Sequence, residues 1–163
     1  MTNSMQRIFL HGLESSSQGF KATMFRELFP DAIHTPDFTG PLPQRMDQLY
    51  EVVQATTGWI MVGSSFGGLM AAVFACTRPN QVERLVLLAP AINLPEFASY
   101  EQQSVSIPTT IYHGRRDDVV PLSPVRQMAE RVFVNLTFHE VDDDHMLRST
   151  VQSIDWQTLL ALP

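Results

Sequence analysis

The stretch VGSSFGGLMAA, residues 62–72, places two serines among three glycines, where a continuous apolar run gives way to an alanine-rich segment. A serine hydroxyl can act as a nucleophile when it lies on a sharp strand-to-helix turn, and the residues two before and two after it must then be small. Gly63 and Gly67 provide such neighbours for Ser65. Ser64 has bulkier residues at the same spacing and is interpreted as a turn residue. Glycine and serine are also common in turns without chemistry, so the pattern needs support from other parts of the chain.

Two later stretches contain the groups that a serine nucleophile needs. A serine hydroxyl reacts slowly unless a base removes its proton and a third group orients that base. The stretch HGRRDDVVP, residues 113–121, offers the carboxylates of Asp117 and Asp118, and DDDHMLRS, residues 142–149, offers the imidazole of His145. Each stretch follows an expected strand, and the carboxyl ends of parallel strands meet at one edge of a sheet. The sequence therefore predicts that His145 and one of the two aspartates lie beside the candidate nucleophile.

These motifs together resemble a minimal α/β-hydrolase, and the resemblance extends over nearly the whole chain. GSSFG resembles the nucleophile elbow, and the order serine, aspartate, histidine is the order of that fold. HGRRDDVVP resembles the H-G-x-x-D-x-x-V-P stretch around the acid, which implies Asp117 rather than Asp118. DDDHML stands where members have a Gly-His or Asp-His pair. FLHGLESSSQGFKA, residues 9–22, resembles the H-G-x-x-S-S loop of small lidless serine esterases of the YqiA type, which implies a fold with no real cap domain.

The expected reaction needs two backbone N–H donors to stabilise an oxyanion. One is the N–H of Phe66, directly after the candidate nucleophile, and the resemblance points to Leu13 in the loop after the first strand for the other. His11 and His113, which each precede a glycine after a strand, are interpreted as structural. The segment 91–107 is too short for a full cap, so we expect an open pocket. Its expected walls are Gly12, Phe38, Leu94, Phe97 and Met146.

Strand-type apolar runs alternate with segments of helical periodicity along the whole chain. This alternation predicts an α/β fold, a doubly wound six-stranded parallel sheet with helices on both faces. The expected strands are 7–10, 32–36, 59–63, 84–90, 109–114 and 135–141, and the expected helices are 20–29, 44–56, 66–78, 124–133 and one within 145–162. No linker divides the chain, so residues 1–163 are expected to form a single domain.

Composition narrows the classes of function. The net charge of −6 offers no basic surface for nucleic acid, and Lys21 is the only lysine. The single cysteine excludes an intramolecular disulfide and a cysteine metal site. The aspartates 142–144 are interpreted as loop carboxylates rather than a cation site. The apolar run near the N-terminus is too short for a signal peptide or a membrane span, so we expect a cytoplasmic protein that binds no membrane.

The expected function is that of a serine hydrolase. It would cleave carboxylic esters of short to medium acyl chain through an acyl-enzyme on Ser65, with His145 as base and Asp117 as its partner. No metal or organic cofactor is expected, and the expected partner is a small-molecule ester, with a thioester as the second choice. The alternative is a hydrolase fold that binds a ligand or partner with little turnover, because a fold alone does not define an activity.

Overall fold

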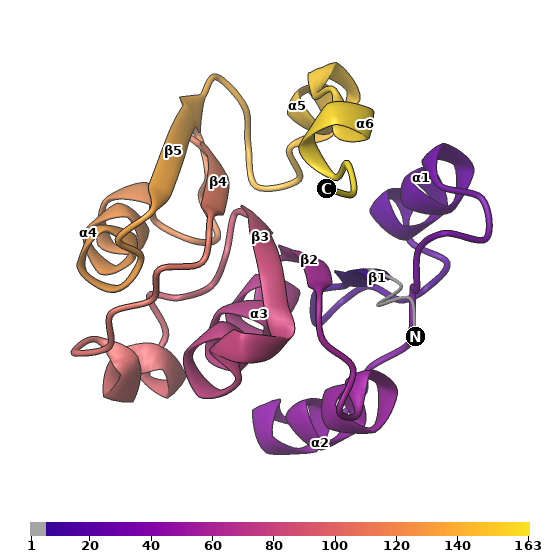
Figure 1. Ribbon diagram of the computed structural model, residues 1–163. Helices are drawn as coiled ribbons and strands as arrows, with labels where there is room; N and C mark the ends of the chain where they lie inside the picture. The colour runs from indigo at the N-terminus through magenta and orange to yellow at the C-terminus, as the bar shows by residue number, and fades with distance from the viewer. Residues whose placement is uncertain (1–5) are drawn as a thin grey trace.

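A parallel sheet carries the loops from which the candidate site is built. The computed structural model describes residues 6–163, and within them the sheet has five strands in the order β1-β2-β3-β4-β5 (Figure 1). All four strand pairs are parallel, and β2 and β3 lie in the middle of the sheet. The strands are β1 (Gln6–Leu10), β2 (Trp59–Ser64), β3 (Val82–Leu88), β4 (Thr109–Gly114) and β5 (Leu136–Val141).

The predicted strand at residues 32–36 is wrong, so the sheet has five strands rather than six. Only His34 pairs with β1, in an isolated parallel bridge to Ile8. Its N–H donates to the carbonyl of Arg7 at 2.8 Å, and its carbonyl accepts from the N–H of Phe9 at 2.9 Å. The ladder does not continue because Pro36, two residues later, has no N–H to donate. The bridge lies on the side of β1 away from β2.

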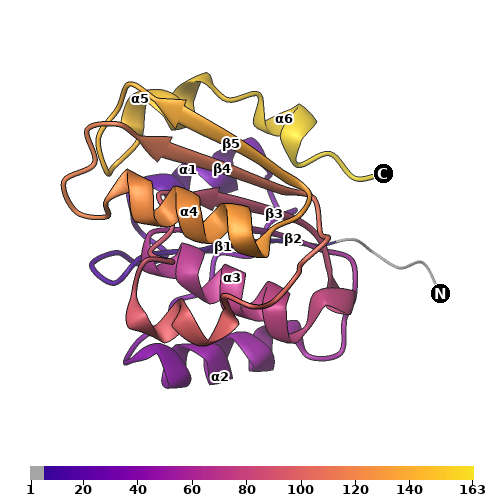
Figure 2. The same cartoon turned by 90° about the vertical axis from the view of Figure 1, so that its left-hand side faces the viewer.

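Helices cover both faces of the sheet (Figures 1 and 2). Along β2, Ile60 and Val62 contribute to one apolar core, and Trp59 and Met61 contribute to the other. This alternation follows from the two-residue period of a strand, and it explains why the central strands are continuously apolar. The first core lies under α1 (Phe20–Leu28), α5 (Arg148–Ser153) and α6 (Trp156–Leu159), and the second lies under α2 (Leu42–Val53), α3 (Phe66–Thr77) and α4 (Leu122–Val132).

The last helix expected within residues 145–162 is two short helices, α5 and α6. The backbone becomes extended at Ile154, and Asp155 then caps α6 by accepting the N–H of Thr158 at 3.1 Å. An aspartate before a helix favours a new N-terminus, because its carboxylate takes one of the unpaired N–H groups. The indole N–H of Trp156 donates to the carbonyl of Val151 at 2.8 Å and keeps the two helices together.

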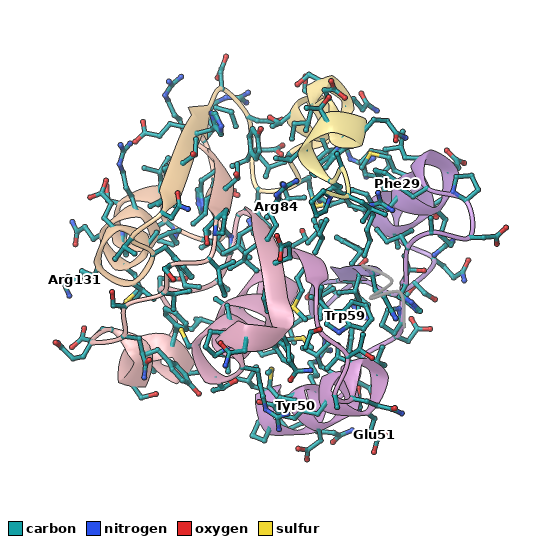
Figure 3. The ribbon with its side chains drawn as sticks, viewed as in Figure 1. Phe29, Tyr50, Glu51, Trp59, Arg84 and Arg131 are labelled. Carbon is teal, nitrogen blue, oxygen red and sulfur yellow. The ribbon has the colours of Figure 1, made fainter. Side chains whose placement is uncertain are left out.

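Two arginines tie the C-terminal segment to the sheet. Arg84 of β3, labelled in Figure 3, donates to the carbonyl of Leu159, and Arg7 of β1 donates to the carbonyl of Leu160 at 2.8 Å.

The segment between β3 and β4 contains the 3₁₀ helix η2 (Pro95–Tyr100), and another 3₁₀ helix, η1 (Pro79–Gln81), precedes β3. Among residues 6–163, no helix is long and apolar enough to cross a membrane.

Candidate active site

Ser65 occupies a strained turn between β2 and α3. Its backbone has φ 56° and ψ −115°, a combination that residues other than glycine rarely adopt. The conformation is held by hydrogen bonds, because the Ser65 N–H donates to the carbonyl of Leu88 at 2.9 Å and the Ser65 carbonyl accepts the N–H of Ala91 at 3.0 Å. Strain of this kind costs about 1–3 kcal/mol and is typical of functional sites.

The two glycines around Ser65 are sterically required. A Cβ added at Gly63 would collide with the carbonyl of Gly67, and a Cβ added at Gly67 would collide with the carbonyl of Leu10 in β1. The small neighbours expected from the sequence are therefore needed on both sides of the turn. They let α3 begin close against β1 and β2, and this close approach fixes the position of the Ser65 side chain.

The loops after β4 and β5 bring two further side chains to Ser65. His145 Nε2 lies 3.1 Å from Ser65 Oγ, and His145 Nδ1 lies 2.8 Å from Asp117 Oδ2. The carboxylate accepts at Nδ1, so Nδ1 carries the proton and Nε2 is free to accept the serine proton. The structure therefore joins Ser65, His145 and Asp117 in one hydrogen-bonded chain. Asp118 is exposed and makes no hydrogen bond to His145 within the described residues.

Asp117 is held from several directions. Its side chain is fully buried, and its Oδ1 accepts the N–H groups of Val119 at 2.9 Å and Val120 at 2.8 Å. His113 Nε2 lies 2.8 Å from the Val120 carbonyl and 3.2 Å from Asp117 Oδ2. Burial lowers the pKa of His113, although the hydrogen bond to Val120 and the charge of Asp117 oppose that shift. His113 is thus a buried neutral donor behind the Asp117 carboxylate. The sequence analysis interpreted His113 as structural and did not include this contact.

Two backbone N–H groups lie free beside Ser65. Phe66 is the first residue of α3, so its N–H has no acceptor within the helix. Within residues 6–163, neither this N–H nor that of Leu13 donates a hydrogen bond. Gly12 places the Leu13 loop next to the serine, since a Cβ on Gly12 would lie 3.5 Å from Ser65 Cβ. His11 fixes this loop, with Nδ1 2.7 Å from the Gly12 carbonyl and Nε2 accepting a main-chain N–H.

A cavity of about 590 Å³ opens next to Ser65 and His145. Its volume is typical of small-molecule sites. Leu13, Val119 and Met146 form an exposed apolar mouth. The lining residues are Phe9, His11, Gly12, Leu13, Glu14, Ser15, Phe20, Lys21, Ser64, Ser65, Val119, His145 and Met146.

The predicted pocket walls are only partly correct. Gly12 and Met146 line the cavity, but Phe38, Leu94 and Phe97 do not. Phe38 and Phe97 are 2% and 0% exposed and belong to the core on the α2 and α3 face, with Leu94 packed against the same core. Leu94 and Phe97 pack there because the segment after β3 turns toward α3, whereas Phe38 belongs to the segment between α1 and α2 and joins the same core. The segment after β3 does not turn over the site.

The cavity contains residues that the sequence analysis missed. Phe9, Phe20 and Val119 carried no signal beyond their apolar character, but Lys21 is the only lysine of the chain. The residue is 9% exposed. Burial, the larger cause, and the nearby guanidinium of Arg148 together lower the pKa of Lys21 to about 8, although the carboxylates of Asp143 and Asp144 oppose the shift.

The acidic cluster after β5 binds groups of its own loop, of α5 and of the loop after β4. Asp143 accepts the N–H and hydroxyl of Thr150 at 3.0 and 2.8 Å, and Asp144 accepts the N–H of Met146 at 3.0 Å. Asp142 pairs with Arg116 at 3.0 Å. These bonds shape the turn that carries His145. In the described part of the chain, no group of three or more His, Cys, Asp or Glu side chains is placed to hold a metal ion.

The parallel sheet, its two helical layers and the loops that meet at Ser65 define an α/β-hydrolase. Est1E from Butyrivibrio proteoclasticus superposes with a TM-score of 0.79 at 17% identity over 96% of this chain and 87% of its own. Mouse alpha/beta hydrolase domain-containing protein 10 gives 0.76 at 17% identity over 91% and 86%. A Xanthomonas campestris protein assigned to the alpha/beta superfamily of hydrolases gives 0.73 at 24% identity over 94% and 93%.

The family follows from the sequence itself. The serine hydrolase family profile matches residues 7–151, which include the whole sheet except its first residue, Gln6, and every loop of the site. The chain belongs to the serine hydrolase family. No curated protein matches the chain.

The buried lysine predicts a particular dependence of stability on pH. In the folded protein Lys21 loses its proton near pH 8, whereas in the unfolded chain it keeps the proton up to about pH 10.5. The unfolded state therefore binds more protons between these pH values, so this residue makes the folded state more stable as the pH rises. In Lys21→Met this contribution is absent. We expect Lys21→Met to be more stable than the wild type at pH 7, and the difference to shrink by about 2 kcal/mol by pH 10.

Urea unfolding of both proteins at pH 7, 8, 9 and 10 measures this difference. The tyrosines, the cysteine and the α-amino group are present in both proteins, so their titration largely cancels in the difference between the two stability curves. A constant gap between the two stability curves would contradict the lowered pKa of Lys21.

Proposed function

We propose that this protein hydrolyses carboxylic esters through an acyl-enzyme on Ser65. The observation that carries the proposal is the position of His145, whose ring bonds the Ser65 hydroxyl through Nε2 and the buried Asp117 carboxylate through Nδ1. Neither bond alone would distinguish a catalytic group from a packed loop histidine. A histidine held by a buried carboxylate and facing a strained serine has the geometry of a general base and its nucleophile.

The chemistry follows from this hydrogen-bonded chain. His145 Nε2 takes the proton of Ser65 Oγ as the oxygen attacks the ester carbonyl carbon. Asp117 stabilises the imidazolium, and the Leu13 and Phe66 N–H groups donate to the oxyanion of the tetrahedral intermediate. The imidazolium then gives its proton to the departing alkoxide, which leaves as the alcohol. In the second half, His145 takes a proton from water, hydroxide attacks the acyl-enzyme, and the acid is released as Ser65 regains its proton.

The cavity supports an acyl group of short to medium length. It has an apolar mouth near Ser65, and its inner part reaches the buried side chains of Phe9 and Lys21. One similar structure has ferulic acid bound to Est1E, and ferulic acid is a carboxylic acid, the kind of product that ester hydrolysis releases. A thioester would use the same acyl-enzyme steps and is the second candidate substrate class.

The first prediction separates the two neighbouring serines. Ser65→Ala should lower the kcat for p-nitrophenyl butyrate on the order of 10³-fold or more and abolish labelling by a fluorophosphonate, because it removes the attacking oxygen. Ser64→Ala should keep most of the activity and all of the labelling. The two variants differ from the wild type by the same single oxygen, so each is the control for the other. Equal losses would sink the assignment of Ser65, and a wild-type protein that is not labelled would favour a binding module with little turnover.

The second prediction separates the two neighbouring aspartates. Asp117→Asn should reduce kcat on the order of 10³- to 10⁴-fold, because an amide no longer fixes the histidine tautomer or stabilises the imidazolium. Asp118→Asn makes the same chemical change on an exposed side chain and should reduce kcat less than about threefold, as surface changes usually have small effects. Kinetics at a fixed pH, with circular dichroism to verify folding, measure both. A greater loss in Asp118→Asn would mean that the acid is displaced by one residue.

The third prediction concerns acyl length. Each methylene that is still being buried adds at most about 0.8 kcal/mol, or roughly a fourfold gain in kcat/KM. Across p-nitrophenyl esters from acetate to palmitate, we expect kcat/KM to rise over the first few carbons and to stop rising at short to medium length, where the cavity ends. A steady increase toward long-chain emulsified esters would show that the acyl group leaves this cavity by another path.

A further inference from the structure

Lys21 places a positive charge in the wall of the same cavity that contains Ser65. It lies in the first turn of α1, and the residue is 9% exposed. Among residues 6–163, no other lysine or arginine lines the cavity, and the only carboxylate in the lining, that of Glu14, is exposed at the surface. The cavity wall therefore has one cation, on a mostly buried residue, and the mouth of the cavity is apolar.

This cation has no direct partner in the part of the chain that the structure describes. Among residues 6–163, Lys21 makes no hydrogen bond, and no carboxylate oxygen lies within 4.0 Å of its ammonium group. Asp143 and Asp144 act on it only at longer range, and so does the like charge of Arg148. Both aspartates use carboxylate oxygens to bind N–H groups of their own loop.

Lys21 is a mostly buried residue whose ammonium group keeps some contact with solvent, and charged groups on buried residues usually have a partner. Arg45, the other charged residue with a positive side chain in the described core, donates its Nε–H to the Gly40 carbonyl at 2.8 Å and lies over the Phe66 ring. Lys21 differs because it makes no such hydrogen bond and lines the cavity. Although burial lowers its pKa to about 8, the side chain is still mostly protonated at pH 7.

The leaving group and the acyl group of a bound ester lie on different sides of Ser65. His145 must protonate the leaving oxygen, so the leaving group belongs beside its ring. A second hollow of about 250 Å³ adjoins His145 there, between Arg116, Asp118 and Asp144. The part of the larger cavity that reaches Phe9 and Lys21 is then left for the acyl group.

We infer that Lys21 binds a carboxylate at the far end of the acyl group, so that the substrate is a monoester of a dicarboxylic acid. The inference rests on the proposed esterase function and adds to it a substrate class. The ammonium supplies the counter-charge, and the apolar wall between it and Ser65 accommodates the intervening methylenes. A neutral ester reacts through the same steps without this contact.

The experiment compares matched substrates that differ in one charge. The anionic esters are mono-p-nitrophenyl glutarate and adipate, and the neutral counterparts are the same compounds with the free carboxylate methylated. The measured quantity is the ratio of kcat/KM for anionic to neutral ester at pH 7. We expect a ratio well above one in the wild type and a fall of at least tenfold in Lys21→Met, mainly through KM. Lys21→Arg should keep part of the preference.

Arg148→Met is the matched control, because it removes a nearby positive charge that does not line the cavity. Its ratio should stay within about twofold of the wild type, as expected for an exposed, solvent-screened charge. A second substrate pair, 4-carboxyphenyl acetate against phenyl acetate, puts the carboxylate on the leaving group. If Lys21→Met changes only this second ratio, the acyl placement is overturned.

The outcomes separate this inference from the proposed function. Hydrolysis of both esters with the same ratio in wild type and Lys21→Met would overturn the role of Lys21 and leave the esterase intact. If the wild type hydrolyses neither ester, the esterase proposal fails. Calorimetric titration with glutarate and adipate then tests whether Lys21 binds an anion. Binding that is lost in Lys21→Met supports the site, and no binding to the wild type overturns it. If Lys21→Met does not fold, a wild-type ratio of one or less overturns the inference by itself.

Discussion

The strained turn at Ser65 is the constraint on which the rest of the site depends. A residue with a Cβ is held at φ 56° there, and the turn is possible only because Gly63 and Gly67 let three backbone segments meet without side chains between them. The cost is offset by hydrogen bonds that join Ser65 to the end of β3 and to the segment that follows it. As a result, the same rigid turn positions both the Ser65 hydroxyl and the N–H of Phe66, the first residue of α3. The sheet, rather than a flexible loop, sets the distance between them.

The other half of the site depends on a close approach between the loops after β4 and β5. A Cβ at Gly114 would collide with the carbonyl of Asp143, and the Arg116 N–H donates to the same carbonyl at 3.1 Å. Asp117 and His145 belong to these two loops, so their 2.8 Å hydrogen bond is set by backbone contacts. The buried carboxylate is tolerated because it accepts two N–H groups and lies against two imidazoles. Satisfying it in this way also keeps the His145 ring directed at Ser65.

The cavity shows a different balance between stability and function. Its apolar mouth exposes Leu13, Val119 and Met146, and its wall holds Lys21, a mostly buried residue whose charge has no hydrogen-bond partner among residues 6–163. Neither feature helps the protein to fold. Groups that weaken the folded state but line the space beside a nucleophile are the groups expected to meet a ligand, because the ligand supplies the missing contacts.

The sequence by itself determined the elements whose causes are local. The elbow could be predicted because the requirement for Gly63 and Gly67 lies within five residues, and the central strands because burial on both faces demands continuous apolar runs. The positions of Asp117 and His145 after successive strands followed from the rule that parallel strands end at one edge. In contrast, whether residues 32–36 form a strand depended on whether their hydrogen bonds to β1 could continue past Pro36. The break in the last helix had a local signal, the cap at Asp155, that the helical periodicity concealed.

Only the tertiary structure decided what lines the cavity. Phe38 and Phe97 have the same apolar character as Phe9 and Phe20, yet the first two are in the core of the opposite face and the other two are beside Ser65. Their places depend on how α1, the segment between α1 and α2 and the segment after β3 pack on the sheet, which is a sum of many weak, long-range contacts. The burial of Lys21 and its lack of a partner are also properties of that packing, since neither can be read from the residue or its neighbours in the chain.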